Sequence, residues 1–433
     1  MENRTKFSHS VILDYEKCRG CTTCIRRCPT EAIRVRSGKA VITTERCIDC
    51  GECIRVCPYK AKKAVYDNFD ECIKSFKWSV ALPAPALYGQ FSHLEDIDYI
   101  LTGLINMGFN QVFEVSKAAE VISDYTRHLM KEGLITTPVI SSACPAVVRL
   151  VRTKFPDLCD NLLPVVAPFN LAAAMAREEA IRKTGLEPHE IGVFFISPCA
   201  AKVTEGKTPL ALDSSGVDGI FSINDLYPRL LKEMNKIDTP MQLASSGIVG
   251  LSWPLSGGES SGLLRDRYLA ADGIENVIKV LEEIEKEKLK SMEFIELNAC
   301  TGGCVGGVLT VENPFVAKVK IKKLRKYLPV SKNKLQEDFH MDSMLWQERI
   351  TYEPVMELDS DISVAMKKMK EMDKIELSFP GLDCGACGAP TCRALAEDIV
   401  SGSANITDCL FVIRDRLSEM YEKTLKNAKK QEE

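Results

Sequence analysis

Eight of the 18 cysteines lie near the N-terminus in a spacing that suits iron–sulfur chemistry. Residues 18–28 and 47–57 each read C-x2-C-x2-C-x3-C, and a proline follows both runs. In this spacing three thiolates wrap one 4Fe-4S cube, while the fourth reaches the neighbouring cube. Paired zinc sites are the alternative, but they do not favour a four-cysteine run that ends in proline. We therefore predict two cubes, one held by Cys18, Cys21, Cys24 and Cys57 and the other by Cys28, Cys47, Cys50 and Cys53.

Another compact cysteine group lies near the C-terminus and reads C-x2-C-x4-C-x16-C. Gly385, Gly388 and Pro390 allow the tight turns that a cube needs. The run resembles the small 4Fe-4S domains of electron-transfer and corrinoid iron–sulfur proteins, and a zinc site is the alternative. We predict a further cube held by Cys384, Cys387, Cys392 and Cys409.

Four cysteines of the middle section are far apart in the sequence, so their neighbours carry the argument. Cys144 and Cys199 each follow an apolar, strand-like run, and Cys300 and Cys304 follow the run at 294–297. Ligands at the carboxyl ends of strands in an α/β sheet gather in one crevice. The four thiolates therefore fit one more cube, although ordinary buried cysteines are the alternative. For the remaining Cys72 and Cys159 we expect plain structural thiols.

The elements that position the middle cysteines follow from the hydrophobic pattern. Residues 191–196 form a continuous apolar run typical of a buried strand, and residues 274–292 have the periodicity of a surface helix. Near the N-terminus, residues 32–43 alternate like a β-hairpin around Ser37 and Gly38. The middle section is thus predicted to be an α/β core.

The chain is expected to contain three domains. An α+β domain of the bacterial ferredoxin type spans residues 1–75, the α/β core spans 76–355, and a small, mostly helical 4Fe-4S domain spans 356–433. Residues 340–361 are poorly patterned and predict a linker. Helical patterns follow it at 362–372, 393–403 and 411–429.

The charge balance excludes some classes of partner. The chain has 56 Lys and Arg against 60 Asp and Glu, a net charge of −4, so nothing favours nucleic acid or an anionic membrane. No segment reaches the roughly 20 apolar residues that cross a bilayer. The polar N-terminus does not resemble a signal peptide. We expect a soluble protein of a reducing cytoplasm.

The segments around Cys144, Cys199 and Cys300 to Cys304 resemble the three signature segments of the FeFe-hydrogenase family, in the same order. The active-site cofactor of that family, the H-cluster, is a 4Fe-4S cube joined through one cysteine to a two-iron unit. The two irons carry CO and cyanide ligands and a bridging dithiolate. The resemblance implies that Cys144, Cys199, Cys300 and Cys304 hold the cube and that Cys304 bridges to the two-iron unit. It also implies that Lys202 contacts one cyanide and that Ala84, Pro85 and Ala86 lie near the other.

Three positions depart from the family pattern. Ala143 stands where a proton-carrying cysteine is usual, and Ser197 and Asn298 stand where methionines are usual, which predicts a more polar pocket. Losing a positioned proton carrier typically costs about 10²–10⁴ in rate, so we expect slow turnover. Glu205 and Glu259 are candidates for another relay, and we favour Glu205 because it follows Lys202 by three residues in the sequence.

These departures are similar to the sensory branch of the family, in its form without a PAS module. The resemblance implies an FeFe-hydrogenase-type oxidoreductase that slowly interconverts H2 with protons and electrons and acts as a hydrogen or redox sensor. The alternatives are a non-catalytic hydrogenase-like scaffold and a fast bidirectional hydrogenase with a different proton path. Expected partners are ferredoxin or a signalling protein and the maturation enzymes of the two-iron unit, and a homodimer remains open.

Overall fold

The computed structural model describes residues 9–335, 341–355 and 358–431. Contacts between residues divide the chain into two compact units. The larger unit comprises Met1–Ile12, Ile48–Gly51 and Ala64–Glu353, and the smaller unit comprises Leu13–Cys47, Glu52–Lys63 and Pro354–Glu433. Domain boundaries at residues 75 and 355 stay a prediction.

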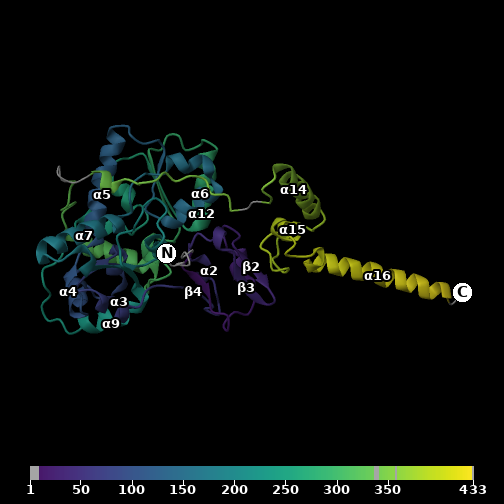
Figure 1. Ribbon diagram of the computed structural model, residues 1–433, viewed down its shortest axis with the longest axis horizontal. Coiled ribbons are helices and arrows are strands. Elements are labelled where there is room, and N and C mark those ends of the chain that lie inside the picture. The colour runs from purple at the N-terminus through teal and green to yellow at the C-terminus, as the bar shows by residue number, and fades with distance from the viewer. Residues whose placement is uncertain (1–8, 336–340, 356–357, 432–433) are drawn as a thin grey trace. The chain divides into compact units, whose positions relative to one another are not determined.

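Two sheets of parallel strands form the centre of the larger unit (Figure 1), as predicted for an α/β core. One sheet has the strand order β6-β5-β8-β9 and the other has the order β10-β11-β7. Strand β8 is buried along its whole length and confirms the strand predicted at 191–196. The strands of the two sheets are β5 (Trp78–Pro83), β6 (Gln111–Val112), β7 (Val139–Ile140), β8 (Ile191–Ser197), β9 (Gly219–Ser222), β10 (Tyr268–Asp272) and β11 (Phe294–Asn298).

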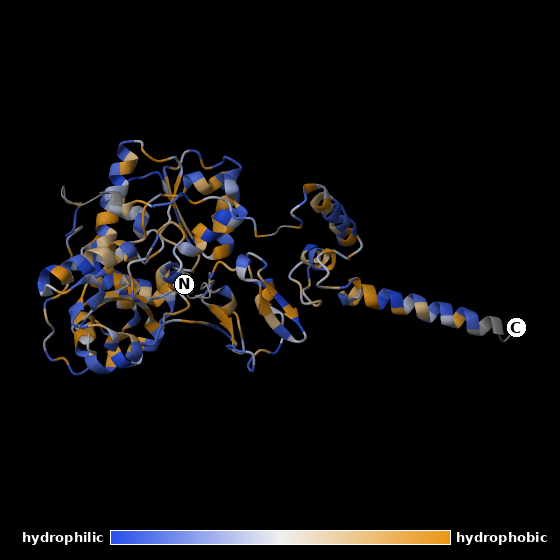
Figure 2. Ribbon diagram, viewed as in Figure 1, coloured by the Kyte–Doolittle hydropathy of each residue, from blue (hydrophilic) through white to orange (hydrophobic). Residues whose placement is uncertain are grey.

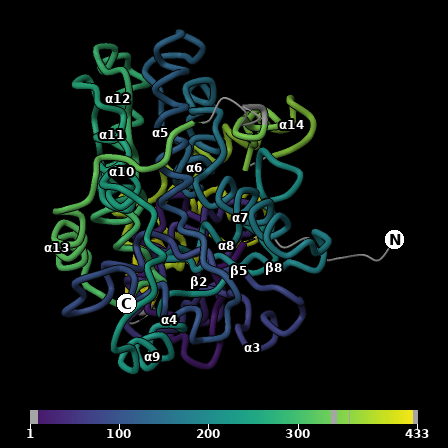
Figure 3. The backbone as a smooth tube through the Cα atoms, turned by 90° about the vertical axis from the view of Figure 1, so that its left-hand side faces the viewer, coloured from purple at the N-terminus to yellow at the C-terminus, as the bar shows by residue number. Residues whose placement is uncertain are grey.

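Helices cover both faces of the sheet that contains β5 and β8, which run side by side in Figure 3. Val193 and Phe195 of β8 pack in one cluster with apolar residues of α5 and α7. Phe194 and Ile196 pack in another with residues of α4 and α9. Successive side chains of a strand point to opposite faces of the sheet. A strand that is apolar throughout, such as β8, therefore contributes side chains to both clusters.

The second sheet packs against α6 and α12. Ile140, Ile295 and Leu297 share a cluster with apolar residues of both helices. Helix α12 ends at Glu285, earlier than the predicted position 292, and Glu287 has a φ of 59° that a continuing helix cannot contain. The helices of the larger unit are α3 (Phe69–Cys72), α4 (Asp98–Asn106), α5 (Val115–Lys131), α6 (Pro145–Lys154), α7 (Pro168–Thr184), α8 (Ala200–Lys207), α9 (Ile223–Met234), α10 (Ile248–Ser252), α11 (Gly258–Gly262), α12 (Ile274–Glu285) and α13 (Pro314–Leu324).

The smaller unit contains the predicted β-hairpin and three C-terminal helices. Strands β2 (Ile33–Arg36) and β3 (Lys39–Ile42) pair antiparallel, and Ser37 and Gly38 form the turn with positive φ. Figure 2 shows the alternation of polar and apolar residues along α16. The remaining elements are β1 (Val11–Leu13), α1 (Thr23–Arg26), α2 (Glu52–Arg55), β4 (Lys62–Ala64), α14 (Ile362–Leu377), α15 (Cys392–Val400) and α16 (Leu410–Gln431).

The predicted linker is wrong for its first part. Met344 is fully buried, its carbonyl accepts the N–H of Val166 at 2.9 Å, and Ile350 is 3% exposed. These residues fill gaps in the core without helical or strand periodicity, so pattern analysis could not place them. His340 lies outside the described residues. Within the described residues, no helix is both long and apolar enough to cross a membrane.

Candidate active site

The four middle cysteines all follow strands of the two parallel sheets. Cys144 follows β7 and precedes the first turn of α6, and Cys199 follows β8 and precedes α8. Cys300 follows β11, and Cys304 begins a single 3-10 turn, Cys304–Gly306. This placement at the carboxyl ends of parallel strands is where α/β folds bind ligands.

The glycine-rich loop after β11 depends on close backbone approach. Gly303 has a φ of 90°, and a Cβ on it would lie 2.6 Å from the carbonyl oxygen of Pro254. The N–H of Val305 donates to that same carbonyl at 3.2 Å. Only glycine allows both the positive φ and the close approach to Pro254. Gly303 therefore lets the loop turn so that Cys304 lies on the same side as the other thiols.

Lys202 connects three of the thiols. Its Nζ donates to Cys304 Sγ at 3.4 Å, and the electrostatic influence of Cys304, Cys199 and Cys144 reaches it. Burial alone would lower the pKa of Lys202, but these sulfurs outweigh burial and raise it. Cys300 follows Ala299, whose N–H hydrogen-bonds the sulfur of Cys144. The folded chain therefore brings together segments that are about 160 residues apart in the sequence.

The charges of this site fit an iron cube. Burial raises the pKa of Cys144 and raises that of Cys199 to about 11. Iron ligands must be thiolates, and bound iron supplies the positive charge that buried thiolates require. Lys202 is an ammonium with three protons to donate, so donors beyond its bond to Cys304 remain for an anionic ligand.

A cavity with an empty volume of about 410 Å³, mouth included, lies next to Lys202 and Cys304. Its walls are mainly apolar, and Ala143 is part of them. The predicted segment Ala84, Pro85 and Ala86 also lines the cavity, together with Val115, Ala119, Pro168, Phe169, Phe195, Pro198, Trp253 and Pro254.

Ser197 and Asn298 do not line this cavity, contrary to our expectation of a more polar pocket. The Ser197 hydroxyl accepts the N–H of Cys199 at 3.1 Å and lies 3.1 Å from the carbonyl of the same residue. Asn298 donates its amide to Glu296 Oε1 at 2.9 Å. Both side chains therefore support backbone or carboxylate groups behind the cavity wall.

The geometry favours Glu259 over Glu205 as a proton carrier. Glu205 forms an ion pair with Arg149 at 3.1 Å and accepts the N–H of Leu210. Glu259 is 4% exposed and accepts the hydroxyl of Ser141 at 2.5 Å. Sequence spacing suggested Glu205, but only the folded chain shows which carboxylate lies beside the signature loop.

A second buried carboxylate stands near Glu259. Glu296 accepts the N–H groups of Gly257 at 3.0 Å and Ser260 at 2.9 Å. Burial, followed by the negative charge of Glu296, raises the pKa of Glu259 to about 8. Two close carboxyl groups in a buried site do not both ionise easily, so one retains a proton near neutral pH. Sequence analysis missed Glu296, which reads as one polar residue in a buried strand.

In the smaller unit, one cavity is lined by all four cysteines predicted to hold the first cube: Cys18, Cys21, Cys24 and Cys57. Backbone N–H groups of Ala40 and Ala61 donate to the sulfurs of Cys18 and Cys57 at 3.4 and 3.2 Å. Such donors stabilise the thiolate form and suit a bound cube. The second predicted set, Cys28, Cys47, Cys50 and Cys53, is divided between the two units and stays a prediction.

The C-terminal cysteines also gather. Cys387, Cys392 and Cys409 pack in one small cluster of the smaller unit. Burial raises the pKa of Cys387, and the charges of Cys384 and Cys409 add to this. Three of the four predicted ligands thus lie in one cluster and the charge of the fourth, Cys384, reaches it, while the cube itself stays a prediction. Cys72 and Cys159 instead pack among apolar side chains, as expected.

Family models match three parts of the chain. "Iron only hydrogenase large subunit, C-terminal domain" matches residues 77–238 and 258–308. "4Fe-4S dicluster domain" matches residues 10–58, and "Putative Fe-S cluster" matches residues 379–411. Fold and site thus define an iron–sulfur protein with a hydrogenase-type core.

The chain is similar to known hydrogenases. The chain is 28% identical to the periplasmic [Fe] hydrogenase large subunit of Nitratidesulfovibrio vulgaris, over 69% of this chain and 86% of that protein. It is 24% identical to iron hydrogenase 1 of Clostridium pasteurianum, over 73% and 68%. A structure of apo [FeFe]-hydrogenase from Chlamydomonas reinhardtii has 15% identity and a TM-score of 0.46, covering 70% of this chain and 94% of that one. The chain belongs to the FeFe-hydrogenase family.

Proposed function

We propose that the protein is an FeFe-hydrogenase that interconverts H2 with protons and electrons at a low rate and serves as a hydrogen or redox sensor. The observation that carries this proposal is the partly buried Lys202, which contacts Cys304 at the wall of the cavity. A cation withdrawn from water is costly unless an anion accompanies it, so this side chain suits a cavity that receives anionic ligands. When bound, the H-cluster would supply the making and breaking of the H–H bond.

The chain's own residues would hold and shield this group. Cys144, Cys199, Cys300 and Cys304 would bind the cube, with Cys304 also facing the cavity. Lys202 would donate hydrogen bonds to one cyanide of the two-iron unit, and the segment at 84–86 would lie near the other. With the group bound, the mainly apolar walls would keep water away from it, which would strengthen the electrostatic interactions inside the cavity.

Proton transfer would use Glu259 and Ser141. The Ser141 hydroxyl bonds Glu259 Oε2 at 2.5 Å and accepts the N–H of Ala143, a residue of the cavity wall, at 3.2 Å. The exchangeable hydroxyl proton of Ser141 is therefore one hydrogen bond away from a residue of the cavity wall, although the side chain of Ala143 has no such proton. The relay has no cysteine next to the reacting group, and this supports slow turnover.

Four 4Fe-4S cubes would carry the electrons, on sixteen of the 18 cysteines. They would exchange electrons with a ferredoxin-type carrier or a signalling partner in the cytoplasm. The two-iron unit with CO, cyanide and dithiolate would be installed by maturation enzymes. The alanine at position 143 supports the sensory role because it predicts slow turnover. A sensor has to bind its ligand reversibly, and it does not need a high rate of turnover.

Infrared spectroscopy of the matured protein tests the proposal. We expect bands of bound CO and cyanide, and we expect the Lys202→Met variant to lose them while its 4Fe-4S content stays unchanged. A matched control is Lys207→Met, which changes a lysine of the same helix that pairs with Asp67 at 2.6 Å. A matured wild-type protein without these bands would instead be a non-catalytic scaffold.

The raised pKa of Glu259 predicts opposite pH dependences for the two directions of the reaction. Below about pH 8 the carboxyl is protonated and can donate, whereas above it the carboxylate can accept a proton. We therefore expect H2 oxidation to rise, and H2 evolution to fall, as the pH increases through about 8. Rates measured in both directions from about pH 6 to about pH 10 check this. If the Glu259→Gln variant showed the same dependence of rate on pH, the titrating group would be a residue other than Glu259.

A further inference from the structure

The C-terminal cysteine loop packs directly against the β2–β3 hairpin within the smaller unit. Val35 of β2 donates its backbone N–H to the carbonyl of Gly388 at 2.7 Å. Arg36 donates Nη1 to the carbonyl of Cys387 at 3.4 Å. Gly388 has a φ of 82°, and a Cβ on it would overlap the carbonyl oxygen of Val35. Glycine is therefore required for this approach.

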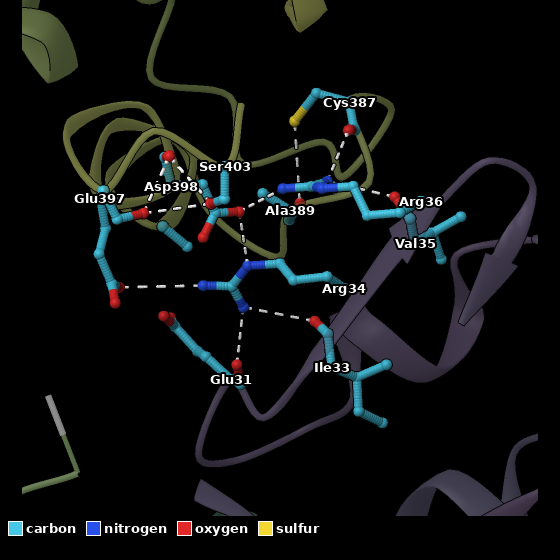
Figure 4. Close-up of polar contacts among 12 residues, drawn as sticks. Glu31, Ile33, Arg34, Val35, Arg36, Cys387, Ala389, Glu397, Asp398 and Ser403 are labelled. Carbon is cyan, nitrogen blue, oxygen red and sulfur yellow. Dashed lines mark hydrogen bonds and ion pairs between the residues drawn. The ribbon is translucent and has the colours of Figure 1, made fainter. Parts of the chain in front are cut away.

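Ion pairs hold the same two segments together (Figure 4). Arg34 Nε donates to Asp398 Oδ2 at 2.7 Å, and both side chains are only 11% exposed. Arg36 pairs with the same carboxylate, and Arg46 pairs with Glu397. We call these five residues the arginine clamp. Because removing one member of a buried pair leaves an uncompensated charge, the clamp specifies where the C-terminal cysteine loop docks.

Val35 belongs to this contact and also to the first cube site. Its side chain lines the cavity formed by Cys18, Cys21, Cys24 and Cys57. Its backbone N–H bonds the residue that follows Cys387. One residue of the hairpin thus lies between the cysteines of two predicted cubes: a hydrogen bond joins it to the residue after Cys387, and apolar packing joins it to the cysteines of the first cube site.

We propose that the C-terminal cube and the first ferredoxin-like cube form one electron-transfer pair, which the arginine clamp holds in contact through Val35. For electrons entering the chain at its C-terminal cysteines, one electron would pass from the reduced C-terminal cube, which would be oxidised, to the first cube, which would be reduced. No proton moves in this step. A one-electron carrier of the iron–sulfur class would reduce the C-terminal cube, or would accept the electron in the outward direction. This pairing rests on the proposed function for its role in H2 chemistry, but its existence does not depend on the two-iron unit.

Electron paramagnetic resonance of the fully reduced chain tests the pairing. The full chain is loaded with 4Fe-4S cubes but produced without the two-iron unit, so failure of the hydrogenase proposal cannot affect the result. Cys384→Ala removes one ligand of the C-terminal cube at an exposed position. We expect this variant to lose one cube and, in addition, to lose magnetic broadening from the signal of the first cube. If the wild-type spectrum equals that of Cys384→Ala plus one unbroadened signal, the pairing is wrong.

The clamp is tested with all cysteines in place. We expect the double variant Glu397→Gln, Asp398→Asn to keep its iron content, to lose the broadening, and to exchange the Val35 amide hydrogen faster by at least tenfold. The matched control Asp373→Asn, Glu376→Gln removes the partners of Arg393 elsewhere in the same unit and should resemble wild type. Should the double variant lose iron, Arg36→Gln, whose side chain is 30% exposed, is the milder change with the same expected direction. Faster amide exchange with unchanged broadening would contradict the role of the clamp.

Discussion

Glu259→Gln should lower the rate of H2 oxidation by about 10²-fold or more, the usual effect of losing a positioned proton carrier. Glu259 is buried, bonds the hydroxyl of Ser141, and has a pKa raised to about 8. Glutamine keeps the size and the hydrogen bond but cannot exchange a proton as the carboxyl does. Turnover of the matured variant, measured by gas uptake with an artificial electron acceptor, checks the prediction.

The control for this loss is Glu205→Gln. Glu205 pairs with Arg149 at a largely buried position, so its substitution should lower stability but leave the rate within a few-fold of wild type. Infrared bands of both variants should match wild type, which shows that the cofactor is still bound. If Glu205→Gln greatly lowered the rate and Glu259→Gln did not, Glu205 would be the proton carrier, as the sequence spacing suggested.

Ala143→Cys should raise the rate of H2 oxidation by about tenfold or more, because it places a proton carrier in the cavity wall. Residue 143 lines the cavity that Lys202 and Cys304 also line, so a thiol there would stand beside the bound group. The matched control is Ala143→Ser, which is close in size and donates a proton less readily than a thiol. A wild-type rate that already equals the rate of the cysteine variant would contradict slow turnover as a consequence of Ala143.

The double variant Ala143→Cys, Glu259→Gln distinguishes two proton paths from a thiol at residue 143. One path runs through Ser141 to Glu259, and the other leaves the cavity by a different route. The backbone of residue 143 already bonds Ser141, and Ser141 bonds Glu259. If a thiol at 143 passes its proton along this chain, the double variant should be as slow as Glu259→Gln alone. If the gain of Ala143→Cys survives in the double variant, the thiol uses another exit. Coupling between neighbouring sites is measured in this way by comparing single and double changes.

Local spacing was sufficient where chemistry depends on neighbours in the chain. The cysteine runs at 18–28 and 47–57 and the C-terminal group match the residues of two iron–sulfur family models. The hairpin at 32–43 was also predictable, because alternation and a Ser-Gly turn are short-range signals. Residues 344–350 were not, because their apolar side chains fill irregular gaps in the core rather than one face of an element.

The sequence by itself determined the family, the α/β core and the cysteines that gather at its strand ends, since these depend on residue type, order and hydrophobic period. Tertiary structure alone decided how the remaining polar groups are used. It turned Ser197 to the backbone, paired Glu205 with Arg149 and placed Glu259 beside Ser141. It also placed the C-terminal cysteine loop on the hairpin through the arginine clamp. Partners this far apart in the chain are selected by burial and charge compensation, which short-range sequence patterns do not encode.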